Sequence, residues 1–283
     1  MSHLKTAVLV ISCGVSLAAC GDGNDAEVQD ALKNINVIDE SNLNDIMLTV
    51  ADPNEAVEFF QRSVRDDPTR IDMQRGLATS LIRAKRATEG AVVWRRVTTH
   101  IDATNEDKVD YADALVRTNK WKEAEQTLNS VPPTHETFKR YRLEAVIADS
   151  KKQWQKADSF YETAVGLTTR PANVFNNWGY SKLTRGQFGK AEELFGEAIA
   201  HDPGLFTAKN NLVIARAKQR NYRLPIIQVT QIEKAQLLHT MALSAVKQGD
   251  RTTAESLLRD AIETHPQHFD AAIQALRSLT EEA

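Results

Sequence analysis

Apolar side chains follow a helical period along most of the chain. In the segment 188–201, Ala191, Phe195 and Ala198 are spaced by four and then three residues, which places them on one face of an α-helix. This pattern of a small, a bulky and again a small residue occurs five times. Its first member recurs every 33 or 34 residues, at Ala56, Gly90, Ala124, Ala157 and Ala191. The chain is therefore predicted to be a series of similar helical units rather than one globular core.

The two positions that follow in each copy keep the same register. Four residues after the small residue comes a bulky apolar one, in turn Phe60, Trp94, Leu128, Tyr161 and Phe195. Three residues further comes a small or β-branched one, in turn Ser63, Val97, Val131, Ala164 and Ala198. A 34-residue period with this internal pattern is typical of the tetratricopeptide repeat, which the chain resembles. The resemblance implies an all-α, right-handed helical solenoid of about six to seven hairpins, one of them degenerate.

The segment from Ala172 to Leu205 carries the fullest copy of the pattern. Gly179 is the small residue expected where the two helices of the unit cross. Gly186 is suited to ending the first helix, and Pro203 to closing the unit. A last helix over about 269–279 is expected to cap the stack with a polar outer face.

One position breaks the register. The small-residue slot that follows Ala191 by 34 residues is Pro225, and proline inside a helix costs about 3 kcal/mol. The second helix of this unit is therefore expected to be missing or delayed, with residues 223–230 forming an extended crossover. A helix is expected to restart at Thr230, whose hydroxyl can form a reciprocal cap with Glu233. The break is either a degenerate repeat or a kink that separates two binding surfaces.

The first twenty residues have the pattern of a secretory signal. A short start with one Lys precedes an apolar or small run from Ala7 to Leu17, which is too short to span a bilayer. The sequence from Leu17 to Cys20 looks like a lipobox, where bacterial lipoproteins are cut before an acylated cysteine. Residues 1–19 are therefore predicted to be removed, and Cys20 to be the lipidation site.

The remaining chain is expected to divide into four parts. The small and polar residues that follow Cys20 cannot bury enough apolar surface to fold, so 20–36 is predicted to be a flexible tether. An N-terminal repeat array is expected over 37–222 and the crossover over 223–230. The C-terminal repeat and capping helix then occupy 231–283.

Composition and the tether indicate where the protein acts. In enteric bacteria, Asp after the acylated Cys holds a lipoprotein in the inner membrane. Here that residue is Gly21, which favours lipid anchoring at the periplasmic face of the outer membrane. The net charge of −3 becomes −4 once Lys5 leaves with the signal, which argues against a general nucleic-acid binder. Cys13 also leaves with the signal, so no disulfide is expected.

Residues that could carry chemistry are few. His265 and His268 could form a metal pair, but a proline lies between them and no third ligand is near in sequence. Sequence motifs for zinc hydrolysis, for serine nucleophiles and for phosphate-binding loops are absent. We therefore predict no enzymatic activity, no metal and no cofactor.

The four tryptophans occupy repeat positions. Trp121 and Trp154 fill the slot that Phe188 fills in the next unit, and Trp94 fills the bulky slot of a second helix. Trp178 lies in an inner slot of a first helix. These positions favour a role in the core over stacking on sugars or bases.

Function is then expected at the concave surface, which the first helices of such repeats line. Two successive units place Asn176–Asn177 and Asn210–Asn211 at the same slots, with Tyr180 and Lys218 nearby. A ladder of amides offers donors and acceptors suited to the backbone of a partner segment. The alternative is that these amides tie neighbouring helices together. Earlier units place four cations at groove slots, namely Arg75, Arg83, Lys139 and Arg142.

The C-terminal half resembles a particular group of repeat lipoproteins. The segments that carry this resemblance to the TadD-like lipoproteins of the tight-adherence (Flp) pilus system are 176–180, 210–212, 235–238 and 263–269. Residues 44–47 add to it. The resemblance implies an outer-membrane factor, such as a pilotin, that helps the secretin pore to localise or assemble. Trp178, where Leu is usual, and Pro225 depart from the generic repeat.

The sequence therefore predicts a non-enzymatic scaffold that binds protein partners, with the secretin or another pilus-assembly component as partner. The alternative is an outer-membrane adaptor for cell-wall enzymes or for the barrel-assembly machinery.

Overall fold

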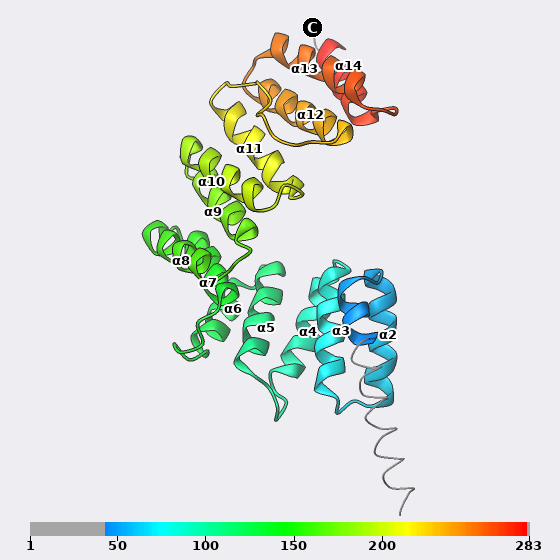
Figure 1. The fold of residues 1–283 in the computed structure, drawn as a ribbon, viewed down its shortest axis with the longest axis vertical. Helices are drawn as coiled ribbons and strands as arrows, with labels where there is room; N and C mark the ends of the chain where they lie inside the picture. Colours follow the sequence, from blue (N-terminus) through cyan, green and yellow to red (C-terminus); the bar gives the residue numbers. More distant parts are fainter. Residues whose placement is uncertain (1–42, 282–283) are drawn as a thin grey trace, which may run out of the picture.

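The computed structural model describes residues 43–281, and the predictions for the signal peptide, for Cys20 and for the tether lie outside them. A helix over 43–49 comes first, followed by α2 to α14 (Figure 1). Their bounds are α2 Pro53–Asp66, α3 Ile71–Arg83, α4 Ala87–Val97, α5 Asn105–Arg117, α6 Trp121–Asn129, α7 Phe138–Ser150, α8 Trp154–Gly166, α9 Ala172–Thr184, α10 Phe188–His201, α11 Phe206–Lys218, α12 Gln231–Lys247, α13 Arg251–Thr264 and α14 Asp270–Glu281. No strand is present in this part of the chain.

Successive hairpins stack side by side from the blue to the red end of the chain (Figure 1). Each helix packs mainly on its neighbours in sequence, as α9 does on α10 and α12 on α13. The predicted all-α tetratricopeptide-repeat solenoid is confirmed. In such a stack each unit buries its apolar face against the next. The free energy of unfolding is therefore close to a sum of the contributions of single units and of the interfaces between neighbouring units.

The core consists of the repeat positions seen in the sequence. Ala191, Phe195 and Ala198 of α10 are all buried, as are their counterparts in earlier units except Ser63, which is half-buried. Gly179 of α9 lies against the Phe195 ring, and a Cβ at this glycine would come within 2.7 Å of the ring. The predicted crossing of two helices at Gly179 is confirmed, because only a residue without a side chain lets the ring approach so closely.

The turn between the two helices of each unit has one recurring geometry. Gly186 has φ of +74°, in the left-handed region, which confirms that it ends the first helix. Other units place Lys85, Asn119, Lys152 and Arg220 at the same point, with φ between 58° and 62°. These left-handed residues lie 33 or 34 residues apart, so the turn geometry is kept even where glycine is absent.

The repeat is interrupted after α11, where no helix forms between Lys218 and Gln231. The second helix of this unit is missing, and α12 packs directly on α11. Leu224 and Ile227 from the connecting loop are partly buried and pack against the C-terminal core cluster. Thr230 caps α12 and the Glu233 carboxylate accepts from the Thr230 backbone N–H, so the predicted capping box is present.

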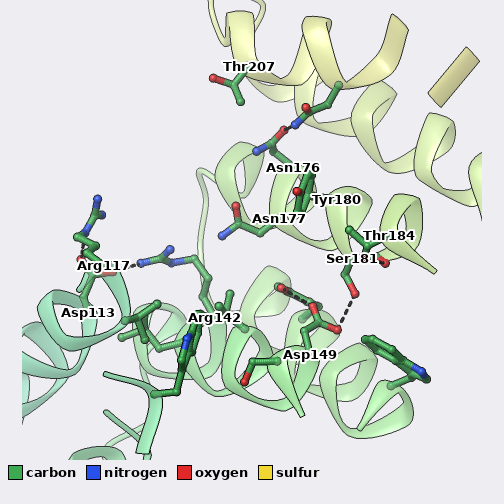
Figure 2. Close-up of a pocket in the computed structure, with 18 residues that line it drawn as sticks. Asp113, Arg117, Arg142, Asp149, Asn176, Asn177, Tyr180, Ser181, Thr184 and Thr207 are labelled. Carbon is green, nitrogen blue, oxygen red and sulfur yellow. Dashed lines mark hydrogen bonds and ion pairs between the residues drawn. The ribbon is translucent and has the colours of Figure 1, made fainter. Parts of the chain in front are cut away.

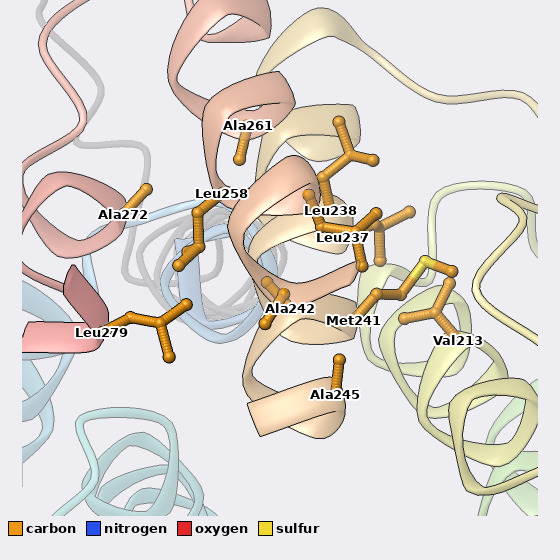
Figure 3. Close-up of a cluster of buried hydrophobic side chains, with 12 residues drawn as sticks. Val213, Leu237, Leu238, Met241, Ala242, Ala245, Leu258, Ala261, Ala272 and Leu279 are labelled. Carbon is orange, nitrogen blue, oxygen red and sulfur yellow. The ribbon is translucent and has the colours of Figure 1, made fainter. Parts of the chain in front are cut away.

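Beyond the interruption, α12, α13 and α14 enclose the C-terminal core (Figure 3). Met241 of α12 reaches back to Val213 of α11, and Leu258 of α13 lies near Leu279 of α14. The solenoid is therefore continuous across the loop, and α14 packs on α13 as the last helix described.

Candidate protein-binding groove

A groove of about 710 Å³ lies between the first helices of four successive units, α5, α7, α9 and α11 (Figure 2). These helices contribute most of its wall, and the start of α6 and residues of α8 complete it. Five of the residues predicted for the concave surface line it, namely Arg142, Asn176, Asn177, Tyr180 and Asn211. The volume is within the range of small-ligand pockets, about 300–1,000 Å³.

At the α5–α7 end, the groove carries a triad of charges. The Asp113 carboxylate accepts from Arg117 Nε at 2.6 Å and from Arg142 Nη2 at 3.0 Å. The sequence did not predict Asp113 as a groove residue, because its pairing with Arg142 depends on how α5 stacks on α7.

Two tryptophans form apolar parts of the wall. Trp121 and Trp154 are the first residues of α6 and α8, just as Phe188 begins α10. Both are half-buried and line the groove. The predicted core role is wrong for Trp154, whereas Trp121 also packs against the core cluster that contains Leu115 and Leu128. Only Trp94 is buried, at 4 % exposure, because the bulky slot of a second helix lies between hairpins. A residue that starts a second helix instead lies beside the turn, where the groove opens.

The middle of the groove holds a second carboxylate. Asp149 accepts hydrogen bonds from Ser181 Oγ at 2.6 Å and from the Tyr161 hydroxyl at 3.0 Å. Burial raises the pKa of Tyr161, and the nearby Asp149 raises it further. The phenol therefore stays protonated and donates to Asp149 throughout the physiological pH range.

The predicted amide ladder lies at the α9–α11 end. Asn211 Nδ2 donates to Asn176 Oδ1 at 3.0 Å, and Thr240 Oγ1 donates to Asn210 Oδ1 at 2.8 Å. Within residues 43–281, the Asn177 side chain makes no hydrogen bond and Tyr180 is 54 % exposed. Three of the four amides therefore connect neighbouring helices, and Asn177 is available to a ligand.

The remaining predicted residues lie outside this groove. Arg75 pairs with Asp107, and Arg83 donates to the Met47 and Ala51 carbonyl groups. Lys139 pairs with an aspartate of α5, namely Asp110. These cations join one unit to the preceding or following one.

Lys218 lines a separate cavity of about 190 Å³ between α11 and α12. Ile214, Leu243 and Lys247 lie in the same wall. Asn210 lies at this side of α11, through its bond to Thr240.

An ion network behind the groove was also missed by the sequence analysis. Asp158 of α8 accepts from Arg185 at 2.7 Å, from Lys182 Nζ at 2.7 Å and from Trp178 Nε1 at 2.8 Å. Burial raises the pKa of Asp158, but the bonds from these three groups outweigh it and lower the pKa to about 2. The network fixes α9, and with it the amides, relative to α8.

The two histidines considered as a metal pair have other contacts. His265 packs on the Phe269 ring, with centroids 4.8 Å apart, and His268 lies 3.0 Å from an Asp270 oxygen. Within 43–281, no three His, Cys, Asp or Glu side chains gather as a metal site would need. Nor does any helix in this range have the length and apolar character needed to cross a bilayer.

This arrangement of helices is that of a tetratricopeptide-repeat solenoid. The tetratricopeptide repeat family matches residues 239–279, which cover most of α12 to α14. No curated protein matches the chain in sequence.

Solved structures share the fold at low sequence identity. A tetratricopeptide repeat protein from Parabacteroides merdae is 11 % identical, with a TM-score of 0.54 over 88 % of this chain and 96 % of that one. Pseudomonas aeruginosa pilF is 14 % identical, with a TM-score of 0.50 over 75 % of this chain and 97 % of that one. The anaphase-promoting complex hetero-tetramer Cut9–Hcn1 gives 12 % identity and a TM-score of 0.59 over 81 % of this chain. This chain spans about half, 46 %, of the matched Cut9–Hcn1 chain.

Proposed function

We propose that this chain is a non-enzymatic scaffold that binds a segment of a protein partner in the groove between α5 and α11. The proposal rests on the side chains of the groove wall that a ligand can reach. Trp121, Trp154 and Tyr180 offer apolar surface, and the Asn177 amide has no partner among residues 43–281. Aromatic surface beside an unpaired amide suits a peptide, which presents both apolar side chains and backbone amides.

We further propose that the scaffold is a lipoprotein anchored through Cys20 at the periplasmic face of the outer membrane. Its partner is then the secretin of a tight-adherence (Flp) pilus system, whose assembly or localisation it assists. The lipobox-like sequence from Leu17 to Cys20 supports the anchor, and the likeness of residues 176–180 and 210–212 to TadD-like lipoproteins supports the partner.

A site-specific crosslink tests this function in intact cells. A photoreactive phenylalanine analogue replaces Tyr180, which lines the groove and is exposed. The matched control replaces Phe138, which is 41 % exposed and lies outside the groove lining. We expect an adduct with the secretin at position 180 and none at position 138.

The identity of the adduct decides between the functions. A cell-wall enzyme or a barrel-assembly component at position 180 would replace the secretin proposal and keep the scaffold. Equal adducts at the two positions, or none at either, would contradict the groove as the binding surface.

A further inference from the structure

The charged side chains that line the groove already have partners inside the protein. Asp113 is paired with both Arg117 and Arg142, and Asp149 accepts from two hydroxyl groups. Two carboxylates and two guanidinium groups are the charged lining groups, so the wall carries no net charge. A neutral wall gives neither sign of ligand a long-range attraction.

A charged ligand would also have to compete with these internal pairs. Asp113 and Arg142 are mostly shielded, with side chains 13 % and 20 % exposed. A ligand carboxylate that took Arg142 would leave Asp113 with one partner fewer in a poorly hydrated place, and such unpaired charges are costly. A ligand ammonium that took Asp113 would do the same to Arg142.

Arg117 is the most exposed of the charged lining groups, at 49 %, and it already donates to Asp113. The lining groups without an internal partner are neutral. Trp121 and Trp154 provide apolar wall, and Figure 2 shows the Asn177 amide pointing into the space between α9 and Arg142. The neighbouring amides cannot serve equally, because Asn176 and Asn211 are bonded to each other. Asn177 has both a donor and an acceptor, which is what a backbone peptide group requires.

We infer that the groove selects an uncharged segment of a partner protein that carries a large apolar side chain and is held by its backbone at Asn177. This inference rests on the proposed function and specifies the chemistry of its ligand. A volume of about 710 Å³ accommodates a few residues rather than a folded domain. Binding without net charge pairing should depend little on ionic strength.

A displayed library of random twelve-residue peptides, selected on the purified full-length chain, tests the inference. Selections run at about 0.15 M and about 1 M salt, where exposed charges are screened beyond about 8 Å and 3 Å. We expect the same uncharged peptides, rich in aromatic or aliphatic residues, at both concentrations. Their affinity should change less than about threefold between the two.

Two groove variants and one control assign the site. Trp154→Ala removes apolar wall, and Asn177→Asp keeps the shape while it replaces the amide donor with a charge. Each should reduce peptide affinity at least tenfold, whereas Phe138→Ala, outside the lining, should not. Circular dichroism checks that each variant is folded. If Trp154→Ala unfolds, Asn177→Asp still tests the site, because the aspartate side chain has nearly the same shape as the asparagine that it replaces.

The outcomes separate the inference from the proposed function. Charged peptides whose binding falls with salt and with both groove variants would overturn the neutral ligand and keep the groove as a protein-binding site. Peptides that bind all variants equally would overturn both.

Discussion

Asn211 on α11 donates a hydrogen bond to Asn176 on α9, with 3.0 Å between Nδ2 and Oδ1. The two residues are 35 apart in sequence and come from first helices of consecutive units. Asn176 is only 9 % exposed, so its carbonyl oxygen depends on this donor. Of the two roles that the sequence left open for the amides, this pair has the structural one, and partner binding stays a prediction for Asn177.

Asn211→Ala should therefore lower the free energy of unfolding, whereas Asn177→Ala should not. Loss of the donor leaves Asn176 Oδ1 unsatisfied, at a cost of about 1–3 kcal/mol. Asn177 makes no internal bond within 43–281, so its removal should cost less than about 0.5 kcal/mol. Urea denaturation of the two variants measures the difference. Equal losses would mean that Asn177 also joins helices.

A methyl group at Gly179 should destabilise the protein. In Gly179→Ala the new Cβ would meet the Phe195 ring at 2.7 Å, and overpacking of this kind costs about 1–3 kcal/mol. Gly196→Ala on α10 is the matched control, because nothing lies within 4 Å of its Cβ position. That variant should gain about 0.5–1 kcal/mol from helix propensity. Thermal melting of both should move the midpoint in opposite directions, and shifts of the same sign would show that the helices do not cross at Gly179.

Asp158→Asn should reduce stability in a pH-dependent way. The folded pKa of about 2 lies below the unfolded value of about 3.9, so the ionised carboxylate stabilises the fold. This contribution is fully present above about pH 4 and is lost as the pH falls toward 2. For a carboxylate 30 % exposed, it should be about 1–2 kcal/mol.

Urea unfolding between pH 7 and pH 3 measures this effect. The wild-type and Asp158→Asn curves should differ most at neutral pH and converge as the pH falls. Glu193→Gln, on the exposed face of α10, is the control and should follow the wild type. A difference that stayed constant with pH would assign the loss to packing rather than to charge.

Cys20→Ala should abolish lipidation, although this residue lies outside the described part of the chain. Without the thiol there is no acyl acceptor, and the signal should remain uncleaved or release unanchored protein. Metabolic palmitate labelling and membrane fractionation measure the two effects. Cys13→Ala, inside the signal, is the control and should keep both the label and the anchor. A label that survived the loss of Cys20 would contradict the lipoprotein assignment.

The repeat pattern was sufficient to predict the solenoid, its core and its interruption. A buried small residue and a bulky partner four positions later require a helix, and their recurrence requires a stack of hairpins. Pro225 excluded a helix at its slot, and Thr230 with Glu233 marked where the next one begins. All these features depend on neighbours in sequence or in the adjacent helix, which a fixed period makes predictable.

The content of the groove was decided by tertiary structure. The period placed Asn177 and Asn211 at one slot, but only the stacking of α9 on α11 paired Asn211 with Asn176 instead. In the same way, the packing of α5 on α7 paired Arg142 with Asp113. Side-chain partners across units depend on the rotation and offset between neighbouring hairpins, which a repeat period does not specify. The sequence thus identified five of the residues that line the groove, and the packing of the units decided which side chains are bonded within the protein.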